Sequence, residues 1–237
     1  MGIDKRLGNV CTINGKDAYD LFNADLKEMR PVAGSIATDI SKTTGASGLR
    51  TAAYDVQVCG IKMIFYVGGA TKDECSLNTS NMISECQNCI IKVDNESFEY
   101  VAILTAFDFS ETGVDFYNQV ELTFSVVKRL PLVVMTFESG EGMFQNVGNV
   151  SSGVIFGITP NNDIETFTIN DIEIKNLSSG NKFIIDGLNG KVTCNGINRF
   201  LDTNLIDFPK VSPGENIIYV SSNDVIVEVS YYPTFLA

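Results

Sequence analysis

The sequence contains no histidine and no tryptophan among its 237 residues. Histidine is the side chain best suited to proton transfer near neutral pH, and it is the commonest metal ligand in proteins. Its absence argues against an enzyme and against a metal site. Because tryptophan is missing too, the chain lacks the largest aromatic platform on which a sugar ring could stack.

Positive charge is also scarce, with 17 Lys and Arg residues against 29 Asp and Glu residues and a net charge of −12. Nucleic acids and anionic membranes repel such a chain, so we expect neither sequence-specific nucleic-acid binding nor a membrane partner. No run approaches 18 apolar residues, and Met1–Arg6 is not followed by an apolar signal-peptide core. We therefore expect no membrane span and no export by the ordinary secretory route.

The six cysteines lack the dense spacing of a small disulfide scaffold and are interpreted as reduced thiols. The segment Cys86-Gln-Asn-Cys89 is the one motif that suggests a metal or redox site. Zinc would need two further thiolate or imidazole ligands, and the other cysteines are not paired at ligand spacing. Packing of both thiols on a helix face is the favoured interpretation, so we predict no metal and no cofactor.

A chain of this length can form one large or two ordinary domains. After Leu130-Pro131-Leu132 the glycine density rises, as is typical of a domain junction. We predict an N-terminal domain over residues 1–132 and a C-terminal domain over 133–237. Both halves are acidic.

The N-terminal half is predicted to form an antiparallel sheet, because its apolar residues recur in short runs with alternation. A helical turn is predicted over Asp17–Phe22, and a longer helix over Leu77–Cys89 with Asn78 or Thr79 as its cap. The predicted strands include Ile61–Val67, Ile90–Val93, Phe98–Phe109 and Gln119–Lys128.

The stretch Pro31–Ala53 is rich in Gly, Ser, Thr and Ala and is predicted to be a long mobile loop. Such a loop is either a disordered connection or a segment that a neighbouring subunit orders. The second reading makes it a candidate inter-subunit loop, with the candidate contact residues Thr38, Lys42, Gly45, Gly48 and Arg50.

The C-terminal half is predicted to be a β-sandwich, because short strands and turn signals alternate along it. Leu177–Tyr232 is interpreted as two β-hairpins, with a two-residue turn at Asn189-Gly190. A turn or a bulge is predicted at Asn170-Asp171, where the apolar parity changes, and a turn is predicted at Pro213-Gly214. Val225–Tyr231 alternates as a strand that lies on a core.

Four segments of this half carry a resemblance: Asp171–Ile174, Ile184–Gly190, Asp207–Pro209 and Pro213–Asn216. In this order they resemble the C-terminal domain of phage distal tail proteins. The resemblance implies a mainly β chain, with an N-terminal tail-tube-like belt domain that contains one helix and a C-terminal galectin-like β-sandwich.

The same resemblance implies a structural role and a set of partners. The chain would form a ring with itself, a homohexamer as in the family, at the tail tip or baseplate of the virion. Its other partners would be the tail-tube protein, the tape measure protein, and the baseplate hub or tail-associated protein. Assembly would take place in the host cytoplasm.

Two other functions stay open from the residues alone. A stand-alone carbohydrate-binding or adhesion module could use Tyr219, Tyr231, Tyr232 or Phe200 as a platform, although core or interface positions suit most of them better. An enzyme could use the carboxylate pairs Asp171/Glu173 or Asp73/Glu74, which are equally well explained as solvated positions. We predict no catalytic residue.

Overall fold

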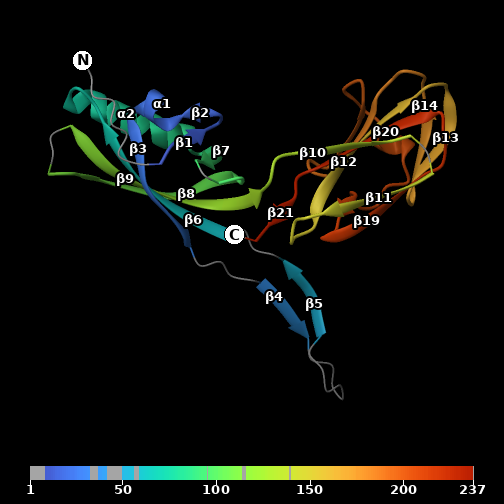
Figure 1. Cartoon of the computed structure of the whole chain (residues 1–237), viewed down its shortest axis with the longest axis horizontal. Helices are drawn as coiled ribbons and strands as arrows, with labels where there is room; N and C mark the ends of the chain where they lie inside the picture. The colour runs from blue at the N-terminus through green and yellow to red at the C-terminus, as the bar shows by residue number, and fades with distance from the viewer. Residues whose placement is uncertain are drawn as a thin grey trace. The chain divides into compact units, whose positions relative to one another are not determined.

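The computed structural model describes residues 9–32, 37–41, 50–55, 59–94, 96–113, 116–138 and 140–236. The chain is mainly β, as the sequence predicts, and most of its described strands pair antiparallel with a neighbour (Figure 1). It divides into two compact units, Met1–Lys128 with Leu236–Ala237, and Arg129–Phe235. No helix in the described ranges is long and apolar enough to cross a membrane.

The elements of the first unit begin and end as follows: β1 (Cys11–Ile13), β2 (Lys16–Asp17), α1 (Ala18–Phe22), β3 (Ala24–Val32), β4 (Ala37–Ser41), β5 (Arg50–Asp55), β6 (Cys59–Gly68), α2 (Lys72–Glu85), β7 (Asn88–Val93), β8 (Glu99–Glu111) and β9 (Tyr117–Arg129).

The elements of the second unit are β10 (Val133–Phe137), β11 (Gly140–Asn146), β12 (Ser152–Pro160), β13 (Ile164–Ile169), β14 (Ile172–Leu177), β15 (Phe183–Asp186), β16 (Lys191–Cys194), β17 (Ile197–Asn198), the short 3-10 helix η1 (Phe200–Asp202), β18 (Lys210–Val211), β19 (Gly214–Val220), β20 (Val225–Tyr231) and β21 (Thr234–Phe235).

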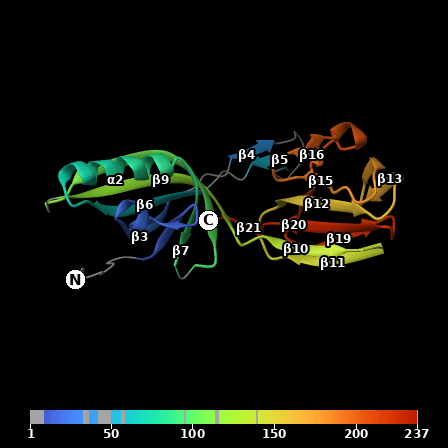
Figure 2. The same ribbon diagram turned by 90° about the horizontal axis from the view of Figure 1, so that it is seen from above.

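The first unit is built on one sheet with the strand order β2-β1-β7-β8-β9-β6-β3. In β9 the side chains alternate between the core and the surface. Val120, Leu122 and Phe124 are buried in the core, whereas Glu121 and the other odd-numbered residues of the strand are not buried. Helix α2 lies along this sheet (Figure 2), and its buried Met82 belongs to the same core as Leu122. The predicted strands over Ile61–Val67, Ile90–Val93, Phe98–Phe109 and Gln119–Lys128 are confirmed, with shifts at their ends.

The predicted start and cap of the long helix are wrong. Helix α2 begins at Lys72, and its cap is Thr71, whose hydroxyl accepts a hydrogen bond from the Glu74 N–H at 3.2 Å. The Glu74 carboxylate accepts from the Ala70 N–H at 2.9 Å, which completes a reciprocal capping arrangement. Cys89 is not on the helix but in β7, so only Cys86 of the thiol pair lies at the helix end.

The second unit is a sandwich of two sheets. One has the order β10-β20-β12-β15-β16-β17, with β18 also paired to β12, and the other has the order β11-β19-β13-β14. Side chains from both sheets, such as Phe156 and Val229 from the first and Phe167 and Ile218 from the second, meet in one core. The predicted alternation over Val225–Tyr231 is confirmed in β20.

Two predicted hairpin details of this half are wrong. Asp186 pairs with Lys191, so β15 and β16 are joined by a loop over 187–190 and not by a two-residue turn at Asn189-Gly190. The Asp186 carboxylate holds this loop by accepting from the N–H groups of Leu188 and Asn189, both at 2.9 Å. Strands β19 and β20 were predicted to form a hairpin, but they lie in different sheets.

The other two predicted turns are present. Ile169 pairs with Ile172, so Asn170-Asp171 is a two-residue hairpin turn, and Asn170 has a φ of 51°. Gly214 has a φ of 89°, the left-handed conformation that the turn at Pro213-Gly214 requires.

Candidate assembly surfaces

The predicted inter-subunit loop contains a two-stranded antiparallel sheet. Thr38 pairs with Tyr54 and Ser41 pairs with Arg50, so the prediction of an irregular loop is wrong for β4 and β5. Lys42, Gly45 and Gly48 lie outside the described residues. The weak apolar periodicity of this stretch hides its strands, because backbone pairing does not depend on an apolar face.

The described strands include no third partner for the β4–β5 hairpin. Within the described ranges, β4 pairs with β5 alone and β5 pairs with β4 alone. A two-stranded hairpin is marginally stable in water unless another strand or a packing surface supports it. The hairpin is therefore a strong candidate for contact with another molecule.

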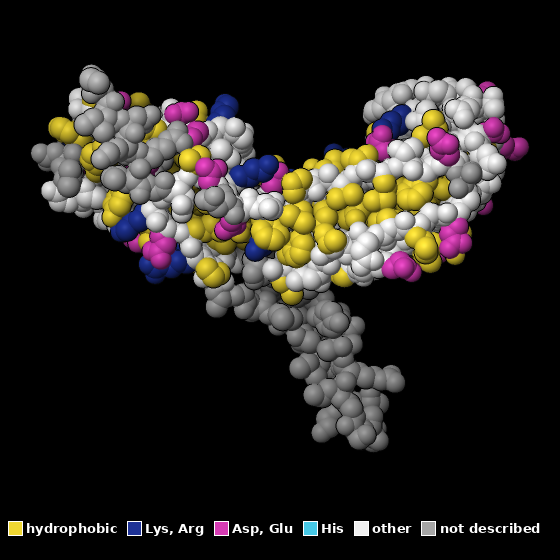
Figure 3. All heavy atoms as spheres, viewed as in Figure 1, with side chains coloured by type: hydrophobic (Ala, Val, Ile, Leu, Met, Phe, Trp, Pro, Cys, Tyr) yellow, Lys and Arg dark blue, Asp and Glu magenta, His cyan; other side chains and the backbone are white. Residues whose placement is uncertain are grey.

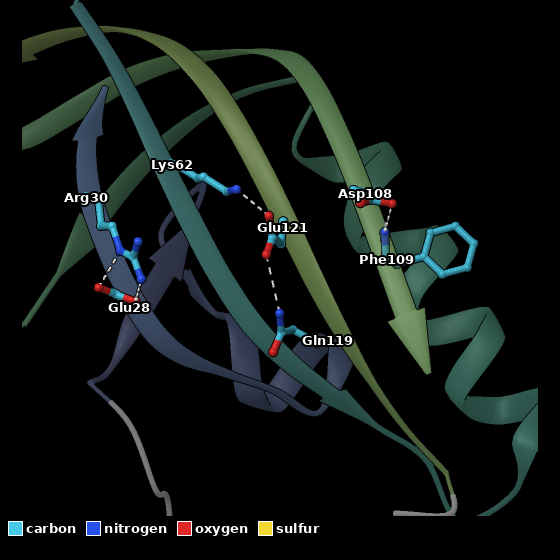
Figure 4. Close-up of polar contacts among 7 residues, drawn as sticks. All are labelled: Glu28, Arg30, Lys62, Asp108, Phe109, Gln119 and Glu121. Atoms are coloured by element: carbon cyan, nitrogen blue, oxygen red, sulfur yellow. Dashed lines mark hydrogen bonds and ion pairs between the residues drawn. The ribbon is translucent and has the colours of Figure 1, made fainter. Parts of the chain in front are cut away.

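A strip of charged side chains crosses one face of the first sheet at β3, β6 and β9 (Figure 4). Arg30 pairs with Glu28, and Lys62 pairs with Glu121, which also accepts from Gln119 at 3.3 Å. The hydrogen bond from Lys62 lowers the pKa of Glu121, and that from Arg30 lowers the pKa of Glu28. Both signs of charge alternate here, and such accessible pairs contribute little to stability.

The predicted thiol pair lies in the core of the first unit. Cys86, Cys89 and Cys11 are buried, and the Cys89 thiol lies 3.7 Å from the Cys86 carbonyl oxygen. Burial, with a smaller contribution from nearby Cys89, raises the pKa of the Cys11 thiol to about 12. Protonated buried thiols are poor nucleophiles and poor ligands. Among the described residues no three Cys, Asp or Glu side chains are grouped to hold a metal ion.

Two of the four carboxylates considered for acid and base work, those of Glu74 and Glu173, have structural partners. Glu74 caps α2, and Asp73 lies in the first turn of the same helix. Glu173 forms an ion pair with Lys175 at 3.1 Å, and the main-chain oxygen of Asp171 accepts from Asn204. Structural contacts therefore account for the carboxylates of Glu74 and Glu173.

The aromatic residues considered for a sugar platform have separate environments. Tyr231 is buried and donates its hydroxyl to the Gln145 carbonyl at 3.1 Å. The Tyr232 ring lies 3.7 Å from the Arg129 guanidinium, and the Phe200 ring contacts that of Phe208. Tyr219, on β19, and Phe200 are exposed, Tyr219 the more so.

A cavity of about 220 Å³ brings together the segments that carry the resemblance. Its lining includes Asp171, Asp207, Pro209 and Asn216, which come from three of those segments. Gly187, from the fourth, approaches the Pro209 carbonyl so closely that a Cβ would lie 2.3 Å from that oxygen. The four segments that carry the resemblance therefore lie close together at one place in the sandwich.

Two apolar surfaces were missed by the sequence reasoning. Figure 3 shows apolar side chains along the second unit where β10 and β11, the edge strands of its two sheets, lie. Partly buried Met135 and Phe144 belong to these strands. In the first unit, Phe107 and Phe109 of β8 are 55% and 54% exposed. Their parity differs from that of buried Tyr100 and Ala102, which is a signal that could have been read.

Comparison with known proteins agrees with this fold. Residues 147–235 match the family model of the siphovirus-type tail component, C-terminal domain. The crystal structure of the Dit protein of phage SPP1, described as a hub adsorption apparatus in phages that infect Gram-positive bacteria, is similar with a TM-score of 0.74 and 13% identity. The similarity covers 96% of this chain and 99% of that one.

A chain of the phage P2 baseplate in its activated conformation with Ca is also similar, with a TM-score of 0.51 and 9% identity over 87% of this chain and 90% of that one. No curated protein sequence matches. The predicted resemblance to phage distal tail proteins is confirmed. The matching proteins are described as a siphovirus-type tail component, a hub adsorption apparatus protein and a chain of a phage baseplate.

Proposed function

We propose that this protein is a distal tail protein whose copies form a homohexameric ring between the tail tube and the baseplate or tail-tip hub of a phage or phage-tail-like particle. One observation carries the proposal: the similarity to SPP1 Dit extends over 96% of the chain and so includes both units. In this proposal the protein is assembled in the host cytoplasm and ends in the virion.

The two predicted domains have different roles in the ring. Residues 1–132 form the belt that closes it, and residues 133–237 form a galectin-like domain at its periphery. Ring closure requires a head-to-tail contact in which each copy uses two different surfaces. The segment with Thr38, Lys42, Gly45, Gly48 and Arg50 supplies one of them, which is supported by the lack of a third strand beside β4 and β5 among the residues that the structure describes.

The ring contacts other tail proteins on its two sides. The tail-tube protein and the tape measure protein lie on one side, and the baseplate hub or tail-associated protein lies on the other. With a net charge of −12 on each chain, acidic residues that face the channel would keep passing DNA from adhering to its wall. A neutral or basic channel surface in an assembled particle would contradict this last point.

Light scattering on the purified full-length protein tests the ring. We expect a mass of about six chains for the wild type. Deletion of residues 38–48 should leave a folded monomer, because it removes the segment that bridges copies without touching either core. A wild-type chain that stays monomeric, both alone and mixed with its tail-tube protein, would contradict the proposal. An intact ring after the deletion would reject the role of the loop.

The alternative function is a carbohydrate-binding or adhesion module in the second unit. The cavity of about 220 Å³ supports this alternative, because a sugar could bind to the polar side chains that line it. These include Asp207, Lys210 and Asn216. Glycan binding by residues 133–237 as a monomer would support this alternative, and the absence of binding to cell-wall polysaccharides would remove it.

A further inference from the structure

Positive charge is absent from most of the second unit. The sequence contains no Lys or Arg between Arg129 and Lys175, and none after Lys210. Strands β11, β13, β19 and β20 therefore each contain at least one acidic side chain and no basic one, with Glu141 in β11 and Glu215 in β19. A surface that these strands form attracts positive charge.

Strand β11 is an edge of its sheet and lacks the features that usually protect such an edge. It has seven residues and pairs with β19 in an unbroken register from Gly140 to Asn146. Proline, lysine, a bulge or a very short strand commonly prevents an edge from pairing with another chain, and β11 has none of these. Among the described strands, β19 is the one partner of β11. The other side of β11 is therefore open to the addition of a strand.

The outward face of β11 and β19 combines apolar side chains with a carboxylate. Met143 lies opposite Ile217, and Glu141 lies opposite Tyr219. Met143 is 63% exposed and Tyr219 is 53% exposed. Glu141 and Met143 are two residues apart, so they lie on the same face of the strand. Exposed apolar side chains gathered on one face are typical of an interaction site.

The inward face of β11 is only partly covered at the same edge. Figure 3 shows apolar side chains along the second unit where β10 and β11 lie. The Phe137 ring of β10 lies so close to Gly142 that a side chain there would have no room, and it contacts the Phe144 ring at 6.4 Å between centroids. Phe137 and Phe144 are only partly buried. A strand added to β11 would cover these rings and exclude water from them.

We infer that the open edge of β11 binds an extended, basic segment of another protein, which continues the sheet as a new strand beside β11. In this complex a Lys or Arg lies opposite Glu141 and an aliphatic side chain lies opposite Met143, because opposite charges and apolar pairs stabilise neighbouring strands. The acidic surroundings of β11 favour a basic occupant. A second copy of this chain fits less well, since each copy carries a net charge of −12.

The inference goes beyond the proposed ring, because it concerns the second unit alone. It identifies a surface and the chemistry of a partner, and it needs no contact between copies of the chain. A ring without peptide binding at β11 and peptide binding without a ring are both measurable, so the two proposals fail separately.

The first test titrates the full-length protein with a synthetic peptide, Thr-Lys-Val-Ile-Val-Lys-Thr, whose ends are blocked. Its sequence reads the same in both directions, so the two possible strand orientations place the same side chains beside β11. The protein carries 13C-methyl methionine, and nuclear magnetic resonance follows the signals up to millimolar peptide. We expect the exposed Met143 methyl signal to shift and the buried Met82 signal to stay in place.

The matched control peptide replaces both lysines with glutamate and keeps every apolar residue. We expect it to bind at least about tenfold more weakly, because its carboxylates lie next to Glu141. A Met143 signal that moves with neither peptide would overturn the inference. Equal binding of both peptides would overturn the basic character of the partner.

The second test separates strand addition from simple adhesion to an apolar patch. Two forms of the basic peptide carry N-methyl groups, one at its second, fourth and sixth residues and the other at its third and fifth. The N–H groups of alternate residues point to opposite edges of a strand, so one form loses its hydrogen bonds to β11 and the other keeps them. We expect one form to bind and the other to fail. Equal behaviour of the two forms would overturn strand pairing.

The third test reverses the charge on the protein. Glu141→Lys should weaken binding of the basic peptide about tenfold and should make the acidic peptide the better ligand. The control is Ile226→Lys, which introduces a lysine at a 41% exposed position in β20 of the other sheet and should bind both peptides like the wild type. A Glu141→Lys protein that keeps the wild-type preference would show that the peptide binds elsewhere.

Discussion

Replacing Gly187 with alanine should destabilise the second unit by about 2–4 kcal/mol. A Cβ at this position would lie 2.3 Å from the Pro209 carbonyl oxygen and 2.7 Å from the Val154 carbonyl oxygen, whereas ordinary contacts begin near 3.4 Å. Two backbone segments would have to move by about 1 Å, and overpacking of this kind costs about 1–3 kcal/mol. The hydrogen bond from the Gly187 N–H to Val154 at 2.9 Å would also weaken, at a further cost of about 1 kcal/mol.

Denaturant unfolding followed by circular dichroism measures this difference. The matched control is Gly190→Ala in the same loop, where nothing except the Phe208 ring approaches a Cβ within 4 Å and only the φ of 66° is unfavourable. That strain costs about 1–2 kcal/mol, so the control should be the milder variant. A Gly187→Ala protein within about 0.5 kcal/mol of the wild type would refute the close approach of the motif segments.

Two further predictions concern the first unit. Thr71→Ala should lower the free energy of unfolding by about 1 kcal/mol in thermal or denaturant melts, because α2 loses its cap. Thr166→Ala, at an exposed position of β13, serves as the comparison, and an equal loss there would contradict the assignment. Because burial raises the pKa of Cys11 to about 12 from an ordinary value of 9.0, the unfolded thiol ionises first as pH rises. Stability should therefore decrease from about pH 9 upward in urea titrations, and a Cys11→Ala variant that shows the same slope would contradict this cause.

The strands were predictable where one face of the chain is buried. In β9 and β20 the residues alternate between core and surface, and that alternation is visible in the sequence. The turn at Asn170-Asp171 was predictable for the same reason, since the apolar parity changes across it. These features depend on neighbours in the sequence.

The remaining features depend on contacts between distant segments. The cap of α2 could have been any of several hydroxyl or amide residues, and packing of Met82 against the sheet selects Thr71. That β19 and β20 belong to different sheets follows from pairing with β11 and β12, which lie far away in the sequence. Strand β7 stops opposite Ile103, and the sequence of β8 does not mark the point at which that pairing ends.

Native mass spectrometry of the full-length protein tests the central claim most directly, because it counts the chains in an assembly. The account predicts a closed complex of six chains of 25.8 kDa each. A single 25.8 kDa species, at assembly concentrations and in the presence of the tail-tube protein, would contradict it.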